Sequence, residues 1–515
     1  MASESPSPRS QGRSTPRWLT ALVVVVAVAL LCGLGYMLST LSLGSHDSGP
    51  ASAGASAAPS RPATISASTA WSKVLGGSTQ LTDVVTAPDG SIVVIGAISA
   101  SDGTLAADSA FPMQDGVRQA VVAQFTASGQ LAWSKALAGS GTMQLTDVAV
   151  ASDGTVAVTG YAGAGTTDVP NVGNATLDSA FLATLTPQGA IAWATTLATR
   201  PHTPDLGASG NPYFELAITT QGTIVTLGTD DLSQGGLAAS GFDASGNRLW
   251  HGTVTTDEAA SIISAAPGTS GSALAVISTT SGNGSSAPAL VTIDPDGTVA
   301  SITTLSGDSA IISATIASDG SLITTAASSG GAVVTKRSPL GTVTWQTPIM
   351  LPASCGLQDI AVAADGGIVA VGSTISASNG AATDGFIAHL TSGGAVDWQR
   401  HLGGTGADTF TGVAVTGDGS IVVVGATAST DGDFPPAKGD RDAVVARINP
   451  DGTLAWAKTY GGTDTDWFSS VAVAADGTIT AAGSTDSTDG DFPPTKGGGD
   501  ALIVHLDANG NLYDR

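Results

Sequence analysis

The chain has 515 residues and a formal net charge of −24, and only 12% of its residues are Asp, Glu, Lys or Arg. Phosphate contacts need clustered Lys and Arg, so 18 bases against 42 acids argue against a nucleic-acid binder. The hydrophobic content of 42% excludes a chain that is disordered throughout.

The N-terminal region predicts a membrane anchor. Residues 1–17 are polar and contain Arg9, Arg13 and Arg17, whereas residues 18–43 contain no charge. About 20 apolar residues suffice to cross a bilayer, and no Lys or Arg follows before Arg61. We therefore expect a cytoplasmic tail (1–17), a transmembrane signal anchor (18–43) and an extracellular remainder. The alternative is a cleaved signal peptide, whose apolar region is usually shorter than this one.

A linker and a repeat region follow the anchor. Residues 44–69 are rich in Ser, Ala and Pro and predict a flexible linker. The two cysteines, Cys32 and Cys355, lie on opposite sides of this linker, so the sequence predicts no disulfide framework.

From Trp71 onward one pattern recurs, with its plainest copy at residues 411–462. Alternating β-branched runs are separated by Asp-Gly turns, which is typical of β-strands joined in hairpins. A Gly stands four residues before an anchor Trp in six copies, and a seventh copy keeps Gly297 but has Ser301 in place of Trp. The six pairs are Gly129/Trp133, Gly189/Trp193, Gly246/Trp250, Gly341/Trp345, Gly394/Trp398 and Gly452/Trp456.

The repeat predicts an all-β fold, a β-propeller over residues 70–515. The last copy has three strands and lacks its Trp strand, whereas Trp71 begins a strand with no hairpin before it. We expect eight four-stranded blades, with the N-terminal strand completing the last blade. If the shortest copy, 302–345, merges with a neighbour, seven blades result. The tryptophans repeat at one structural position, so we interpret them as packing residues.

The repeats resemble the bacterial SBBP-type β-propeller repeat family. The resemblance rests on the Val-Ala-Val run with its Asp-Gly turn, the loop STDGDFPP at 429–436 and 487–494, and the Asp-Ala pairs at 442–443 and 500–501. It implies a surface or secreted location and supplies no catalytic residues. A weaker similarity is to quinoprotein-like eight-bladed propellers, through the Gly-x-x-x-Trp motif. The Asp expected eight residues before each Trp is replaced by Phe125, Leu185, Leu390 and Ile448, so this similarity implies shared blade geometry.

Antiparallel blades place the loops between second and third strands on the same face as the links between blades. That face carries the long loops, at about 97–119, 162–179, 374–383, 427–441 and 485–499, and functional residues concentrate on such loops. We therefore predict that it is the binding face. Its acidic residues favour cations or basic partners. They are Asp102, Asp108, Asp408, Asp431, Asp433, Asp440, Asp464, Asp466, Asp489 and Asp491.

Part of this acidic set forms a candidate metal site. Asp102, Asp431 and Asp489 each stand six residues after a strand-ending Gly, and Asp433 and Asp491 add further carboxylates. Clustered oxygens on a bent backbone can hold Ca²⁺, although the DxDxDG-type loop is absent. The competing interpretation is an Asx-type turn at the strand exit. No other cofactor is predicted.

The sequence offers little support for catalysis. His389 and His505 occupy matching positions in strands, which predicts packing, and no H-E-x-x-H or G-x-S-x-G motif occurs. We expect a non-catalytic binding or scaffold module at the bacterial cell surface. It would reach the membrane through one helix and contact an envelope protein or glycan. The alternative is an envelope enzyme, either a glycan-active hydrolase or lyase or a quinoprotein-like oxidoreductase.

Overall fold

The four repeating strands of each copy form one antiparallel sheet, and the computed structural model contains eight such sheets. The structure describes residues 71–75, 80–87, 89–98, 118–126, 130–165, 167–173, 176–201, 214–229, 237–254, 259–280, 286–305, 311–317, 319–328, 331–351, 356–375, 382–474, 476–495 and 499–512. These residues all belong to one compact unit, Leu41–Arg515. The predicted tail, anchor and linker lie outside them. Within the described residues, no helix has the length and hydropathy needed to span a membrane.

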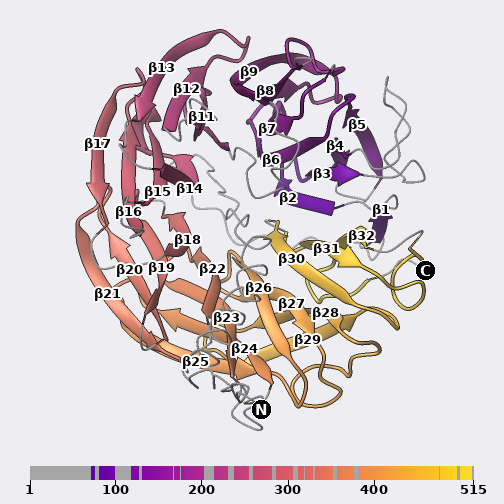
Figure 1. Ribbon diagram of the computed structural model, residues 1–515. Coiled ribbons are helices and arrows are strands. Elements are labelled where there is room, and N and C mark those ends of the chain that lie inside the picture. The colour runs from indigo at the N-terminus through magenta and orange to yellow at the C-terminus, as the bar shows by residue number, and fades with distance from the viewer. Residues whose placement is uncertain are drawn as a thin grey trace, which may run out of the picture. The chain divides into compact units, whose positions relative to one another are not determined.

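Blades 1 to 4 follow one another along the chain (Figure 1). Blade 1 contains β2 (Gln80–Thr86), β3 (Ile92–Ile98), β4 (Gln119–Phe125) and β5 (Leu131–Leu137). Blade 2 contains β6 (Met143–Val150), β7 (Val156–Ala162), β8 (Leu177–Leu185) and β9 (Ile191–Pro201). Blade 3 contains β10 (Glu215–Ile218), β11 (Ile224–Thr229), β12 (Leu237–Phe242) and β13 (Arg248–Val254). Blade 4 contains β14 (Ala259–Pro267), β15 (Ala273–Thr280), β16 (Ser286–Ile293) and β17 (Val299–Thr304), with the 3₁₀ turn η3 (Thr269–Gly271).

Blades 5 to 8 repeat this plan, and the last blade takes its fourth strand from the other end of the repeat region. Blade 5 contains β18 (Ile311–Ile316), β19 (Leu322–Ser328), β20 (Gly331–Arg337) and β21 (Val343–Met350). Blade 6 contains β22 (Gly356–Val362), β23 (Ile368–Ile375), β24 (Thr383–Leu390) and β25 (Val396–Leu402). Blade 7 contains β26 (Asp408–Val415), β27 (Ile421–Thr427), β28 (Asp442–Ile448) and β29 (Leu454–Tyr460). Blade 8 contains β30 (Asp466–Val473), β31 (Ile479–Thr485), β32 (Asp500–Leu506) and β1 (Trp71–Leu75), with Trp71 opposite His505.

The prediction of eight four-stranded blades is therefore confirmed, and the short copy at 302–345 does not merge with a neighbour. The first strand of each blade lies nearest the centre and contacts the first strand of the next blade, including β30 with β2 (Figure 1). The hydrophobic core is divided among the seams between blades. One cluster, for example, joins Val94 and Val121 of blade 1 to Ala482 and Ile503 of blade 8.

The Gly-x-x-x-Trp spacing is explained at the outer end of these seams. The Trp398 ring of blade 6 packs on Gly452 of blade 7, where an added Cβ would lie 2.7 Å from the ring. The Trp398 indole Nε1 donates a hydrogen bond to the Pro450 carbonyl at 3.0 Å. Gly452 has φ 80°, a conformation in which a side chain is strained. Equivalent indole-to-carbonyl bonds join Trp133 to Pro187, Trp193 to Ala244 and Trp345 to Ser392, which confirms the packing role of these residues.

Candidate functional site

The two copies of the loop STDGDFPP lie on the predicted binding face, in blades 7 and 8. One copy follows β27 and the other follows β31, and each reaches the link that enters its own blade. In blade 7, the Asp431 carboxylate accepts hydrogen bonds from the Thr405 amide and hydroxyl, at 2.8 and 3.0 Å. In blade 8, Asp489 accepts the same pair from Thr463, at 2.8 and 3.1 Å. The first Asp of each Asp-Gly-Asp therefore ties its loop to a link.

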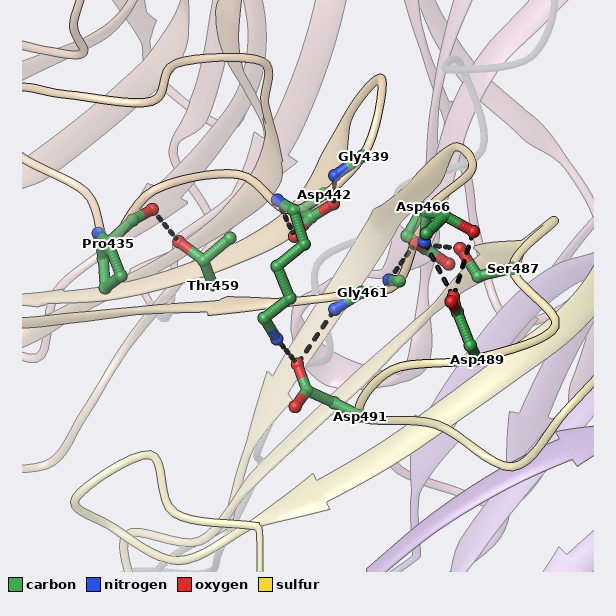
Figure 2. Close-up of polar contacts among 12 residues, drawn as sticks. Pro435, Gly439, Asp442, Thr459, Gly461, Asp466, Ser487, Asp489 and Asp491 are labelled. Carbon is green, nitrogen blue, oxygen red and sulfur yellow. Dashed lines mark hydrogen bonds and ion pairs between the residues drawn. The ribbon is translucent and has the colours of Figure 1, made fainter.

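The second Asp of each motif adds a reciprocal contact with the same link. The Asp433 amide donates to the Gly403 carbonyl, and the Gly403 amide donates to the Asp433 carboxylate, both at 3.1 Å. Asp491 pairs with Gly461 in the same way, at 3.1 and 3.2 Å (Figure 2). A Cβ added at Gly432 would lie 2.1 Å from the Gly403 carbonyl oxygen, so only glycine fits between the two acids.

Each link also contributes a buried carboxylate to these contacts. We call the set of loop and link residues of one blade its latch: Asp408, Ser429, Asp431 and Asp433 in blade 7, and Asp466, Ser487, Asp489 and Asp491 in blade 8. The Asp408 carboxylate accepts from the Ser429 hydroxyl at 2.7 Å and from the Gly404 amide at 2.9 Å. Asp466 accepts from Ser487 at 2.8 Å and from Gly462 at 3.0 Å, and burial raises the pKa of Asp466 (Figure 2). Both acids are fully buried. The two carboxyl groups are therefore not exposed on the loop surface but hold the links in place, and a role for them in partner binding stays a prediction.

Aromatic packing completes the latch. Phe434 and Phe492, which follow the Asp-Gly-Asp motifs, are buried. Phe434 meets Phe410 edge-on with ring centroids 6.1 Å apart, and Phe492 lies against Tyr460 and Phe468. The Lys438 ammonium of blade 7 forms an ion pair with Asp491 of blade 8, which joins the two loops (Figure 2). These loops are thus long but firmly held.

The four calcium-ligand candidates that lie in the described residues belong to two different blades. Asp431 and Asp433 serve the latch of blade 7, Asp489 and Asp491 serve that of blade 8, and Asp102 lies outside the described residues, as does Asp108. Across the described part of the chain, no three His, Cys, Asp or Glu side chains are placed to hold a metal ion. The Asx-turn interpretation did not include these contacts: the carboxylates accept hydrogen bonds from the links that enter their own blades. Calcium binding stays a prediction. Asp440 and Asp464 are exposed on the same face.

The two strand histidines have packing partners. The His505 ring nitrogen Nδ1 lies 3.0 Å from the Thr480 hydroxyl, and burial lowers the pKa of His505. His389 stacks on Trp398 with ring centroids 5.3 Å apart and lies 3.3 Å from the Asp397 carboxylate. This agrees with the predicted packing role.

A second group of acids, missed by sequence reasoning, lies on the first strands. A β-bulge in β2, β6 and β22 precedes Asp83, Asp147 and Asp359. Asp147 accepts hydrogen bonds from the amide of Val148 beside it and from the Leu216 amide of the next blade, both at 2.7 Å. Asp359 repeats this with Ile360 at 2.8 Å and Val413 at 2.9 Å. The recurring Leu-Thr-Asp-Val at 81–84 and 145–148 was the available signal.

The comparison with protein families supports the β-propeller fold. A family model described as a domain of unknown function (DUF5122) β-propeller matches residues 416–454. No curated protein matches the chain in sequence. Among solved structures, dihydro-heme d1 dehydrogenase NirN is 15% identical, with a TM-score of 0.45 and coverage of 77% of this chain and 70% of that one. A eukaryotic initiation factor is 9% identical, with a TM-score of 0.43 and coverage of 78% and 81%. The β-propeller domain of the trilobed protease from Pyrococcus furiosus is 8% identical, with a TM-score of 0.41 and coverage of 74% and 97%.

Proposed function

We propose that this chain is a non-catalytic binding or scaffold module of the bacterial cell surface. In this proposal residues 18–43 anchor it in the cell membrane with the N-terminus in the cytoplasm, and the propeller presents its long-loop face to an envelope protein or glycan. The observation that carries the proposal is the latch of blades 7 and 8. Its loops are exposed at their tips yet fixed by carboxylate–amide bonds and by buried Phe434 and Phe492.

A fixed loop face favours binding because little conformational entropy is lost when a partner docks. The exposed acids Asp431, Asp440, Asp464 and Asp489 give that face a negative charge, which favours a partner with basic groups. Two of these acids, Asp431 and Asp489, are also held in place by hydrogen bonds from Thr405 and Thr463. The envelope enzyme stays the alternative from sequence.

Charge reversal at the face tests the binding role. The Asp440→Lys/Asp464→Lys variant changes two exposed acids whose carboxylates take no part in the latch bonds described above. A juxtaposed like charge costs several kcal/mol, so we expect capture of a basic envelope partner to fall by about tenfold or more. The measurement is quantitative pull-down from envelope extract with the tagged full chain.

The matched control is Asp294→Lys/Asp451→Lys. It makes the same change of net charge on exposed turns that join third and fourth strands, on the opposite face. Capture should persist in this control. Equal capture by the wild type and both variants would rule out the acidic loop face as the binding surface.

We also infer that β1 keeps the ring of blades closed. Five residue pairs, from Trp71–His505 to Leu75–Ala501, support this inference. The apolar cluster shared by blades 8 and 1 supports it as well. In this arrangement the edge of β32 is covered by a segment more than 400 residues earlier in the chain.

A further inference from the structure

Three buried carboxyl groups stand at one structural position on three consecutive first strands. They are Asp83 on β2, Asp147 on β6 and Glu215 on β10, and none has more than 9% of its surface exposed. The Leu216 amide donates a hydrogen bond to Asp147, just as the Val413 amide donates to Asp359, so Glu215, the residue before Leu216, occupies the position of Asp147 one blade further on. The first strands of blades 1, 2 and 3 contact one another, which brings the three acids into one row.

The described strands packed against this row carry no Lys or Arg. The strands packed against β2, β6 and β10 are β3, β4, β7, β11, β14, β30, β31 and β32. In these described strands there is no Lys or Arg, and the titratable residues are Tyr161, Asp466, Asp500 and His505. Asp466 begins β30 in the latch, Asp500 begins β32, and His505 lies beside Thr480. Buried like charges without a compensating cation strongly favour keeping a proton.

One oxygen of the row points to the same conclusion independently. Glu215 Oε2 is buried and has no hydrogen-bond partner. An ionised carboxylate oxygen left in this state would carry a large desolvation cost, whereas a protonated carboxyl group would not. The row is therefore arranged to hold fewer than three negative charges.

We propose that Asp83, Asp147 and Glu215 form a proton-dependent clamp that holds the first strands of blades 1, 2 and 3 together and loosens as the row becomes ionised. The clamp is local. Asp359 makes the same two amide bonds in blade 6, but its neighbours at the equivalent position are Ser313 and Gly412, so it has no adjacent acid.

The direction of the pH dependence follows from burial and mutual repulsion. Burial raises the pKa of Asp147 to about 7, and burial together with the charge of Asp147 raises the pKa of Asp83 and of Glu215 well above their usual values. The folded chain thus holds protons that the unfolded chain releases near pH 4. Stability from the clamp is therefore greatest below about pH 4 and falls as pH rises from there through about 7, where Asp147 ionises, and further as Asp83 and Glu215 follow.

Hydrogen exchange of the purified full chain tests the clamp with an internal reference. Amide protection of β6 and β10 is compared with that of β22 and β26 at about pH 5.5 and about pH 7.5, which cancels the intrinsic pH effect on exchange. Each proton lost changes an opening equilibrium by up to about tenfold per pH unit, so we expect the protection ratio to fall by about tenfold or more.

The variants Glu215→Gln and Asp359→Asn make the test specific. Glu215→Gln removes one of the three ionisable groups and its repulsion with Asp147, so the protection ratio should depend less on pH than in the wild type, whereas Asp359→Asn should keep the wild-type dependence. A ratio that does not change in the wild type, or that changes equally in Glu215→Gln, overturns the proposal. If Glu215→Gln does not fold, infrared spectra of the wild type decide: a protonated-carboxyl band should be present at about pH 5.5 and weaker at about pH 8, because Asp147 ionises between these values, and its absence at pH 5.5 or an unchanged intensity overturns the clamp.

Discussion

A single indole couples neighbouring blades at most of the outer seams, and the exception is informative. Blade 4 has Ser301 where the other repeats have Trp, but Gly341 of blade 5 keeps φ 82°. The Thr303 methyl group covers this glycine instead, 2.8 Å from where its Cβ would be. The Pro339 carbonyl occupies the position that accepts an indole proton in other seams, two residues before the Gly. Blade 5 thus keeps the glycine and the carbonyl group that contact an indole in other seams, although blade 4 has no Trp at this position.

We therefore expect Ser301→Trp to stabilise the chain. The new indole would bury apolar area on Gly341 and donate to the Pro339 carbonyl, with Thr303 rotating away. We expect the free energy of unfolding to rise by about 1 kcal/mol, measured as a higher denaturation midpoint in urea. The reciprocal variant, Trp398→Ser, should lower the free energy of unfolding by about 2 to 3 kcal/mol. A lower midpoint for Ser301→Trp would show that Thr303 already fills the seam better than an indole can.

At the scale of the strand, the sequence predicts the plan of a blade but not its inner edge. Asp-Gly turns and the Gly-x-x-x-Trp spacing identify each hairpin and its outer seam, because these signals are local. The bulge at Thr82 and Thr146 leaves only the short recurring Leu-Thr-Asp-Val, which does not reveal its role, since that depends on the fit to the next blade: the Thr146 hydroxyl donates to the Phe214 carbonyl, 68 residues away. The latch partners of Asp431 and Asp489 were missed for the same reason, because Thr405 and Thr463 are 26 residues distant.

The role of β1 gives a prediction at this scale. A chain that begins at residue 76 lacks β1, whereas a chain that begins at residue 70 keeps it. Loss of five paired residues removes about four ladder hydrogen bonds and exposes the edge of β32, whose residues are all buried. We expect the free energy of unfolding of the shorter chain to be about 3 to 5 kcal/mol lower, and we expect this chain to aggregate through the exposed edge of β32. Thermal melting with light scattering measures both effects, and indistinguishable melting of the two chains would contradict closure by β1.

The propeller is acidic and the N-terminal tail is basic, and the charge of the tail predicts how the chain is oriented in a membrane. Residues 1–17 contain three Arg and one Glu, whereas most of the 42 acids lie after residue 70. Positive charge flanking a membrane segment is retained in the cytoplasm, while acids contribute little to orientation. The tail, and not the charge of the propeller, should therefore decide on which side of the membrane the propeller is placed.

We accordingly expect the full chain to sediment with membranes and to lose its propeller when protease is added to spheroplasts, with an N-terminal epitope protected. Deletion of residues 18–43 should release the chain from the membrane fraction. Replacing Arg9, Arg13 and Arg17 by Ser and changing Ser45 and Ser48 to Lys reverses the charge difference across the segment. This variant should protect the propeller and expose the epitope in a large share of molecules. A soluble, shortened chain that lacks the N-terminal epitope would instead favour the cleaved signal peptide, because cleavage removes the apolar segment from the mature protein.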